Sequence, residues 1–178
     1  MAGRDGQAEA RLTSIPRRGM NTFTVPLLLA WLHAAQGSID EAVKSLDPLA
    51  KVSSFAALRS LHLGLIQELA GRKAEAEKNL SQAVTATQSL RVIQAYGRFL
   101  ERNARADEAK ALYRSVKEKN PGGDSFDEAF ARLEKGGEAD PIIAGHRDGL
   151  AEVFFNLAGT LAQGRSSELA VIYGRLTL

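Results

Sequence analysis

The side chains best suited to acid–base or metal chemistry in this chain are its three histidines, His33, His62 and His146. A metal ion needs three or four converging ligands, and a histidine that acts as a general base needs a partner that orients its ring. Neither His33 nor His62 has a histidine or a carboxylate three or four residues later, and no phosphate-binding loop or dinucleotide fingerprint is present. The sequence therefore predicts no catalytic residue, no metal site and no cofactor site.

His146-Arg147-Asp148 matches the tripeptide found in the catalytic loop of protein kinases. That loop needs an asparagine five residues after the aspartate, and position 153 is valine. No glycine-rich phosphate loop precedes the tripeptide. We therefore interpret these residues as the start of a helix.

Three arginines are the clearest candidates for binding. Arg91, Arg98 and Arg102 lie at i, i+7 and i+11, which places them on one face of a helix. Arginine pairs with carboxylates and is frequent at binding hot spots, so this face could attract an acidic partner. The alternative is an ordinary solvated helix face, and the sequence does not separate the two.

The composition limits the class of protein. Hydrophobic residues make up 44% and charged residues 25% of the 178 residues, which is typical of a folded chain and not of a disordered one. A net charge of +2 does not favour nucleic acid as a partner. The absence of cysteine excludes disulfides and thiolate metal sites but leaves the compartment, cytoplasm or periplasm, open. No apolar run is long enough to predict a membrane span.

Three columns of residues recur along the chain at intervals of 34, 34 and 33. One column holds a small residue, the second a large apolar residue four positions later, and the third a glycine or alanine five positions earlier. The columns are Ala8, Ala42, Ala76 and Ala109; Leu12, Leu46, Leu80 and Tyr113; and Gly3, Gly37, Gly71 and Ala104.

Each column has a physical reason to exist in a pair of helices. The small residue lets two helices approach closely, and the large apolar residue one turn later fills the space beside it. The glycine permits the turn with positive φ that ends the preceding helix. An irregular helical bundle is the alternative, but a bundle has no reason to keep a 34-residue register.

These residues resemble the tetratricopeptide repeat (TPR), a 34-residue helix–turn–helix unit. The best-matching copy carries Tyr96-Gly97, Leu100, Ala109, Tyr113 and Pro121; the others carry Leu63-Gly64, Ala76 and Leu80, and Leu29-Ala30, Ala42 and Leu46, without the closing proline. The resemblance implies an all-α fold, a TPR-like right-handed solenoid of antiparallel helix pairs. It also leads us to expect a piece of a longer bacterial TPR-repeat protein.

We expect residues 1–178 to form one array. Its predicted parts are a half repeat at 3–20, repeats at 23–56, 57–89 and 90–123, an inserted short helix and loop at 124–146, and a divergent, truncated repeat at 148–178. Phe126, Phe130 and Leu133 give the inserted helix its apolar stripe. Apolar residues at the end of the last repeat, among them Leu176 and Leu178, lack a capping helix, which predicts self-association there.

Arg17-Arg18 followed by the apolar residues 23–35 could also be a signal peptide. The alternative is the buried first helix of repeat one. Leu29 and Ala30 lie 34 residues before Leu63 and Gly64, so the register favours the repeat.

The resemblance implies that the first helices of the repeats line a concave groove that binds an extended peptide or a helix. The family's inward positions fall on Leu27, Trp31, Leu58, Leu61, Leu65, Glu68, Arg91, Gln94, Arg98 and Glu101, with Arg102 beside them. The expected partner therefore has an acidic segment for the arginines and an apolar anchor for the Trp31 end. The leucines could instead be core residues that neighbouring repeats cover.

We therefore expect a non-catalytic scaffold for protein–protein contact, with no cofactor and no nucleic acid. One alternative is the TPR arm of a larger enzyme, for example a sugar transferase, whose catalytic domain lies outside these residues. The other alternative is a structural array that assembles with itself.

Overall fold

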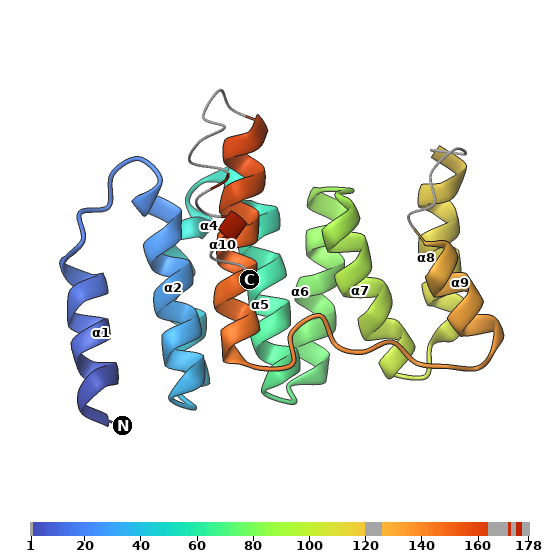
Figure 1. Ribbon diagram of the computed structural model, residues 1–178, viewed down its shortest axis with the longest axis horizontal. Helices are drawn as coiled ribbons and strands as arrows, with labels where there is room; N and C mark the ends of the chain where they lie inside the picture. The colour runs from blue at the N-terminus through green and yellow to red at the C-terminus, as the bar shows by residue number, and fades with distance from the viewer. Residues whose placement is uncertain (1, 120–125, 164–170, 172–173, 176–178) are drawn as a thin grey trace.

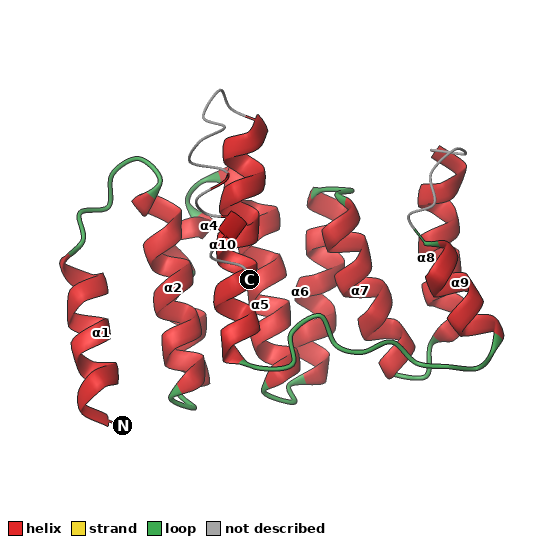
Figure 2. Cartoon of the chain, in the orientation of Figure 1, coloured by secondary structure: helices red, strands yellow, loops and turns green. Residues whose placement is uncertain are grey.

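A computed structural model describes residues 2–119, 126–163, 171 and 174–175. Every regular element in these ranges is a helix, and none is a strand (Figure 2). This confirms the predicted all-α class. The helices are α1 (Ala2–Ser14), α2 (Asn21–Ala35), α3 (Ile39–Ser45), α4 (Asp47–Ala50), the 3-10 helix η1 (Ser53–Phe55), α5 (Ala56–Leu69), α6 (Lys73–Ala86), α7 (Leu90–Arg102), α8 (Ala106–Lys119), α9 (Asp127–Glu134) and α10 (His146–Gln163).

Helices that follow one another pack in pairs: α2 on α3, α5 on α6 and α7 on α8. Short turns join the members of each pair. Gly37, Gly71 and Ala104 take φ values of 78°, 75° and 58° in these turns, as the third column predicted. Ala104 adopts this conformation without being glycine, which costs free energy that the packing of α7 on α8 must offset. Gly3, the earliest member of the column, lies inside α1 instead of in such a turn.

The large residue of the second column meets a glycine of the first helix inside two of the pairs. A Cβ atom added to Gly64 of α5 would lie 2.6 Å from Cγ of Leu80 in α6. One added to Gly97 of α7 would lie 2.3 Å from the ring of Tyr113 in α8. The large residue of the second helix therefore occupies the space that a side chain on the first helix would need. This contact explains why the two residue types keep one spacing in both pairs.

The buried residues form two clusters. The larger one joins α2, α3, α5 and α6 and includes residues of α10, such as Val153 and Leu157. The smaller one joins α7, α8 and α9 around Tyr113. The helix predicted as an insertion is α9. Its Leu133 and the residue before the helix, Phe126, close this second cluster. Helix α9 packs on α8 at the far end of the row of helices (Figure 1).

The placement of α10 differs from the predicted array. A truncated repeat at 148–178 would follow α9, but α10 packs against α2 and α5, near the other end of the molecule (Figure 1). The segment 135–145 carries the chain back past α7. The physical reason is that α10 has an apolar stripe, Gly149, Val153 and Leu157, that is buried in the larger cluster. The predicted second helix of this repeat, with Leu169 and Tyr173, and the predicted uncapped end at Leu176 and Leu178 lie outside the described residues.

Candidate functional site

The strongest candidate site is the surface of α2, α5 and α7 against which α10 lies. We call this surface the inner face and define it by Trp31, His62 and Arg91, one residue from each helix. Trp31 is 0% exposed, and a Cβ atom added to Gly149 of α10 would lie 2.1 Å from Cε3 of its indole. Only a glycine at position 149 lets α10 approach α2 this closely.

Trp31 and His62 are joined by a buried hydrogen bond. Nε1 of Trp31 donates to Nδ1 of His62 over 2.9 Å, so His62 must be neutral with its proton on Nε2. That Nε2 atom is buried and has no hydrogen-bond partner among the described residues. Burial lowers the pKa of His62 to about 4, and the nearby carboxylate of Glu152 opposes part of this shift.

This shift predicts that stability depends on pH. The pKa of His62 in the unfolded chain is about 6.5, so between pH 6.5 and 4 the unfolded state binds a proton that the folded state does not. The contribution of His62 is therefore fully present above pH 6.5 and is lost as the pH falls toward 4. We expect the free energy of unfolding, measured with urea, to drop by about 3 kcal/mol over this range through His62 alone.

His62→Asn is the matched control for this measurement, because its side-chain oxygen can still accept the Trp31 proton and does not titrate. The expected result is a smaller drop in stability between pH 6.5 and 4 than in the wild type. An identical drop in both proteins would show that His62 is not the group responsible.

Arg91 and Glu152 form the charged contact between the inner face and α10. Nε of Arg91 lies 3.1 Å from Oε1 and 3.0 Å from Oε2 of Glu152, and a second guanidinium nitrogen also binds the carboxylate. Glu152 is only 2% exposed. The guanidinium carbon of Arg91 also lies 5.3 Å from the ring centroid of Phe155. A buried carboxylate with a bidentate arginine partner is a specific contact, because either charge alone would be costly to bury.

The other two arginines of the predicted face hold the segment that leads to α10. Arg102 donates to the backbone oxygen of Asp140 over 3.1 Å and forms an ion pair with Glu68 of α5. Arg98 donates to the same oxygen of Asp140 over 3.4 Å. The three arginines therefore face one side, as their spacing predicted, and groups from 139–152 of the same chain occupy that side.

The structure corrects part of the predicted groove. Leu27, Trp31, Leu61 and Leu65 were predicted to line the groove, with burial in the core as the alternative for the leucines, and all four are fully buried in the larger cluster. They are buried because neighbouring helices, including α10, cover them. Leu58, Glu68, Gln94 and the three arginines are half-buried.

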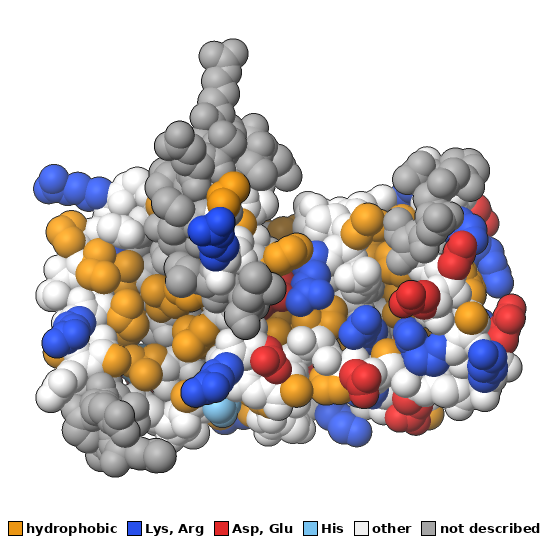
Figure 3. Space-filling model, in the orientation of Figure 1, with side chains coloured by type: hydrophobic (Ala, Val, Ile, Leu, Met, Phe, Trp, Pro, Cys, Tyr) orange, Lys and Arg blue, Asp and Glu red, His pale blue; other side chains and the backbone are white. Residues whose placement is uncertain are grey.

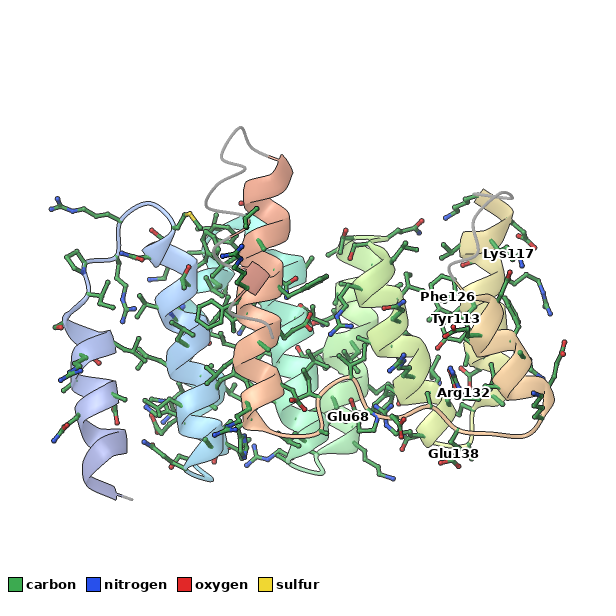
Figure 4. All side chains as sticks on the ribbon, in the orientation of Figure 1. Glu68, Tyr113, Lys117, Phe126, Arg132 and Glu138 are labelled. Carbon is green, nitrogen blue, oxygen red and sulfur yellow. The ribbon has the colours of Figure 1, made fainter. Side chains whose placement is uncertain are left out.

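Glu101 was also predicted in the groove, but it points to the other end of the molecule. It is 2% exposed, accepts a 2.7 Å hydrogen bond from the hydroxyl of Tyr113, and pairs with Arg132 of α9 over 2.9 Å. Figure 4 labels Tyr113, Phe126 and Arg132 at the end of the molecule formed by α8 and α9. Burial, the largest cause, and the Glu101 carboxylate raise the pKa of Tyr113, so its hydroxyl stays a donor. Glu101 of α7 thus binds both α8, through Tyr113, and α9, through Arg132.

The residues of α10 that contact the inner face were missed by sequence reasoning. The missed residues are Gly149, Glu152 and Val153. One signal could have found them: Glu152 is an acidic residue inside an otherwise apolar stripe that runs through Gly149, Val153 and Leu157. A charge in such a stripe indicates a buried partner of opposite charge.

One serine lies beside a histidine and a carboxylate, in an arrangement that could suggest nucleophilic catalysis. Nδ1 of His33 lies 3.0 Å from Oγ of Ser45, and its Nε2 lies 3.3 Å from Oε1 of Glu9. The Ser45 hydroxyl, however, donates to the backbone oxygen of Glu41 over 2.9 Å, as a serine within a helix commonly does. We therefore assign these contacts to holding α1 against α2 and α3.

The His146-Arg147-Asp148 tripeptide begins α10, as predicted. Oδ2 of Asp148 accepts hydrogen bonds from the backbone N–H groups of Ala144 at 2.8 Å and Gly145 at 3.1 Å. Asp148 therefore orders the entry to the helix.

Among residues 2–119, 126–163, 171 and 174–175, no group of three or more histidines, aspartates or glutamates could hold a metal ion. No helix in these ranges is both long enough and apolar enough to cross a bilayer.

Comparison of the chain with family models, with curated proteins and with solved structures gave no match.

Proposed function

We propose that this chain is a TPR-like scaffold whose inner face binds an amphipathic helix, and that α10 occupies that face in the structure described here. The observation that carries the proposal is the contact of α10 with helices more than 40 residues away in the sequence. The repeat columns and the helix pairs support the TPR-like arrangement. The ligand is a protein segment, so the function is recognition and not catalysis.

The contacts of α10 define the chemistry of such a ligand. Gly149 permits close approach to Trp31, Glu152 binds Arg91, and Val153 and Leu157 fill apolar space. These residues lie at i, i+3, i+4 and i+8, which is one face of a helix. The sequence predicted a partner with an acidic group and an apolar anchor, and α10 has both features. A ligand from another protein would need the same pattern to replace α10.

The experiment places a large side chain on α10 where there is no space for it. Gly149→Leu should drive α10 off Trp31 and expose the inner face. A fluorescent peptide with the wild-type sequence of residues 146–163 should then bind this variant. We expect the peptide to bind this variant at least about tenfold more tightly than the wild type, because the tethered α10 no longer competes for the inner face. Overpacking should destabilise the bound position of α10 by more than about 1.4 kcal/mol, which corresponds to a factor of ten in affinity. Fluorescence anisotropy measures this binding.

Gly159→Leu is the matched control, because Gly159 lies on α10 and a Cβ atom there would meet nothing within 4 Å. This variant should bind the peptide as weakly as the wild type. If Gly149→Leu does not fold, Glu152→Lys offers a second route, since it places a cation against Arg91. A folded protein that has released α10 and still ignores the peptide would rule out a helix-binding inner face.

A further inference from the structure

A cavity of about 720 Å³ lies between α1, α2 and α10, beside the inner face. Its walls are mostly apolar, and Figure 3 shows hydrophobic side chains gathered on this side of the molecule. Ala8 and Leu12 come from α1, Leu28 and Leu32 from α2, and Leu150 and Phe154 from α10. The volume is in the range of protein sites that bind a ligand.

Four of the lining residues are half-buried, although the repeat register predicts that they are buried. Their exposure can be compared with that of the residues 34, 67 or 68, and 101 positions later. Ala8, Leu12, Leu28 and Leu32 are half-buried, whereas their counterparts are at most 2% exposed: Ala42, Ala76 and Ala109; Leu46, Leu80 and Tyr113; His62 and Ala95; Ile66 and Phe99.

The counterparts show what kind of element covers these positions. Leu80 is covered by α5 at Gly64, and Tyr113 is covered by α7 at Gly97. His62 on α5 contacts Trp31 of the preceding helix α2. The large residue of a second helix is thus covered by the first helix of the same pair, at a glycine. The residue on a first helix is covered by the first helix of the preceding pair. Leu12 and Leu32 line the open cavity instead.

The charges around the cavity restrict the occupant further. Arg11 and Arg147 line it and are exposed, and none of the lining residues is a carboxylate. Within the described part of the chain, neither guanidinium forms an ion pair. Nδ1 of His146, which also lines the cavity, is buried and has no hydrogen-bond partner there. An occupant with acidic side chains at its edge would therefore be favoured.

We infer that this cavity binds an amphipathic helix of a partner protein in the position that a first helix takes in the later pairs. The helix carries a glycine or alanine against Leu12, an apolar face over Leu28 and Leu32, and acidic residues near Arg11 and Arg147. This site adjoins the inner face, because Trp31 belongs to both, and the inference does not require that α10 leave its place. The protein would then hold its partner by completing the half repeat at α1.

The probe is a peptide that copies α5, residues 56–69, with both ends blocked. It carries Arg59→Glu, so that its net charge is negative, and a fluorescent label. Short peptides are poorly helical in water, so the affinity will be modest. We expect saturable binding by anisotropy, slower hydrogen exchange of the α1 amides in the complex, and weaker binding at high salt. The same peptide with Gly64→Leu should bind at least about tenfold less tightly, because the larger side chain meets Leu12.

On the protein, Leu12→Glu should abolish binding, and the exposed neighbour Thr13→Glu should leave it within about twofold, as a surface change does. Equal binding of both peptides, or protection of α10 and not of α1, would overturn the inference. So would self-association of the protein without peptide that protects α1, since a second copy would then cover the cavity. The proposed function would survive each of these results, because it depends on Gly149 and Arg91.

Discussion

Replacing Trp31 by alanine is expected to lower the free energy of unfolding by about 3–5 kcal/mol, as is usual for a large buried aromatic residue. The indole is 0% exposed and contacts both His62 and α10. Its removal leaves a cavity at the junction of α2, α5 and α10, and it leaves His62 Nδ1 without its donor. Urea unfolding followed by circular dichroism measures the change.

Leu90→Ala is the control, because Leu90 is 46% exposed and should change stability by no more than about 0.5 kcal/mol. The sequence alone placed Trp31 in a groove that binds a partner. A folded Trp31→Ala variant with wild-type stability would contradict the burial of Trp31 under α10.

Arg132→Met should destabilise the protein by about 3–5 kcal/mol, because it leaves the carboxylate of Glu101 buried without its cation. Methionine keeps most of the length of the side chain, so the loss reports mainly the charge. The effect should appear first at α9, which Arg132 joins to Glu101 of α7. The double variant Glu101→Met with Arg132→Met should recover part of this loss of stability. Adding Tyr113→Phe should recover more, because the Tyr113 hydroxyl has lost its acceptor, the Glu101 carboxylate, in the double variant.

The exposed pair Arg72–Asp40 provides the control for this cycle. Its two side chains are 38% and 76% exposed, so Arg72→Met should cost no more than about 1 kcal/mol. Similar losses for Arg72→Met and Arg132→Met would show that the Glu101 network is not a buried one.

The helix pairs could be predicted from the sequence because they depend on contacts between neighbours in the chain. Gly64 and Leu80 are 16 residues apart, and the equivalent pair in the next repeat, Gly97 and Tyr113, has the same spacing. A regular spacing of small and large residues reveals such contacts without any structure. The turn at Ala104 was predicted for the same reason, although the residue there is not glycine.

The position of α10 could not be predicted in this way. Its apolar residues satisfy the repeat pattern and also fit the inner face, and periodicity does not distinguish the two. The choice depends on contacts between distant residues, chiefly Gly149 with Trp31 and Glu152 with Arg91. The candidate site changed for the same reason: the spacing of the arginines showed that they share a face, but not that the chain itself supplies their partners.

The contact between α10 and the inner face can be tested most directly by hydrogen exchange of the α10 amides in charge-reversed variants. Arg91→Glu and Glu152→Arg each place like charges together, whereas the double variant restores an attractive pair. We predict fast exchange of α10 in both single variants, protection regained in the double variant, and unchanged protection of α6 throughout. If the α10 amides exchange at the same rate in all four proteins, Glu152 does not hold α10 on Arg91, and the inner face is not a site that binds an acidic helix.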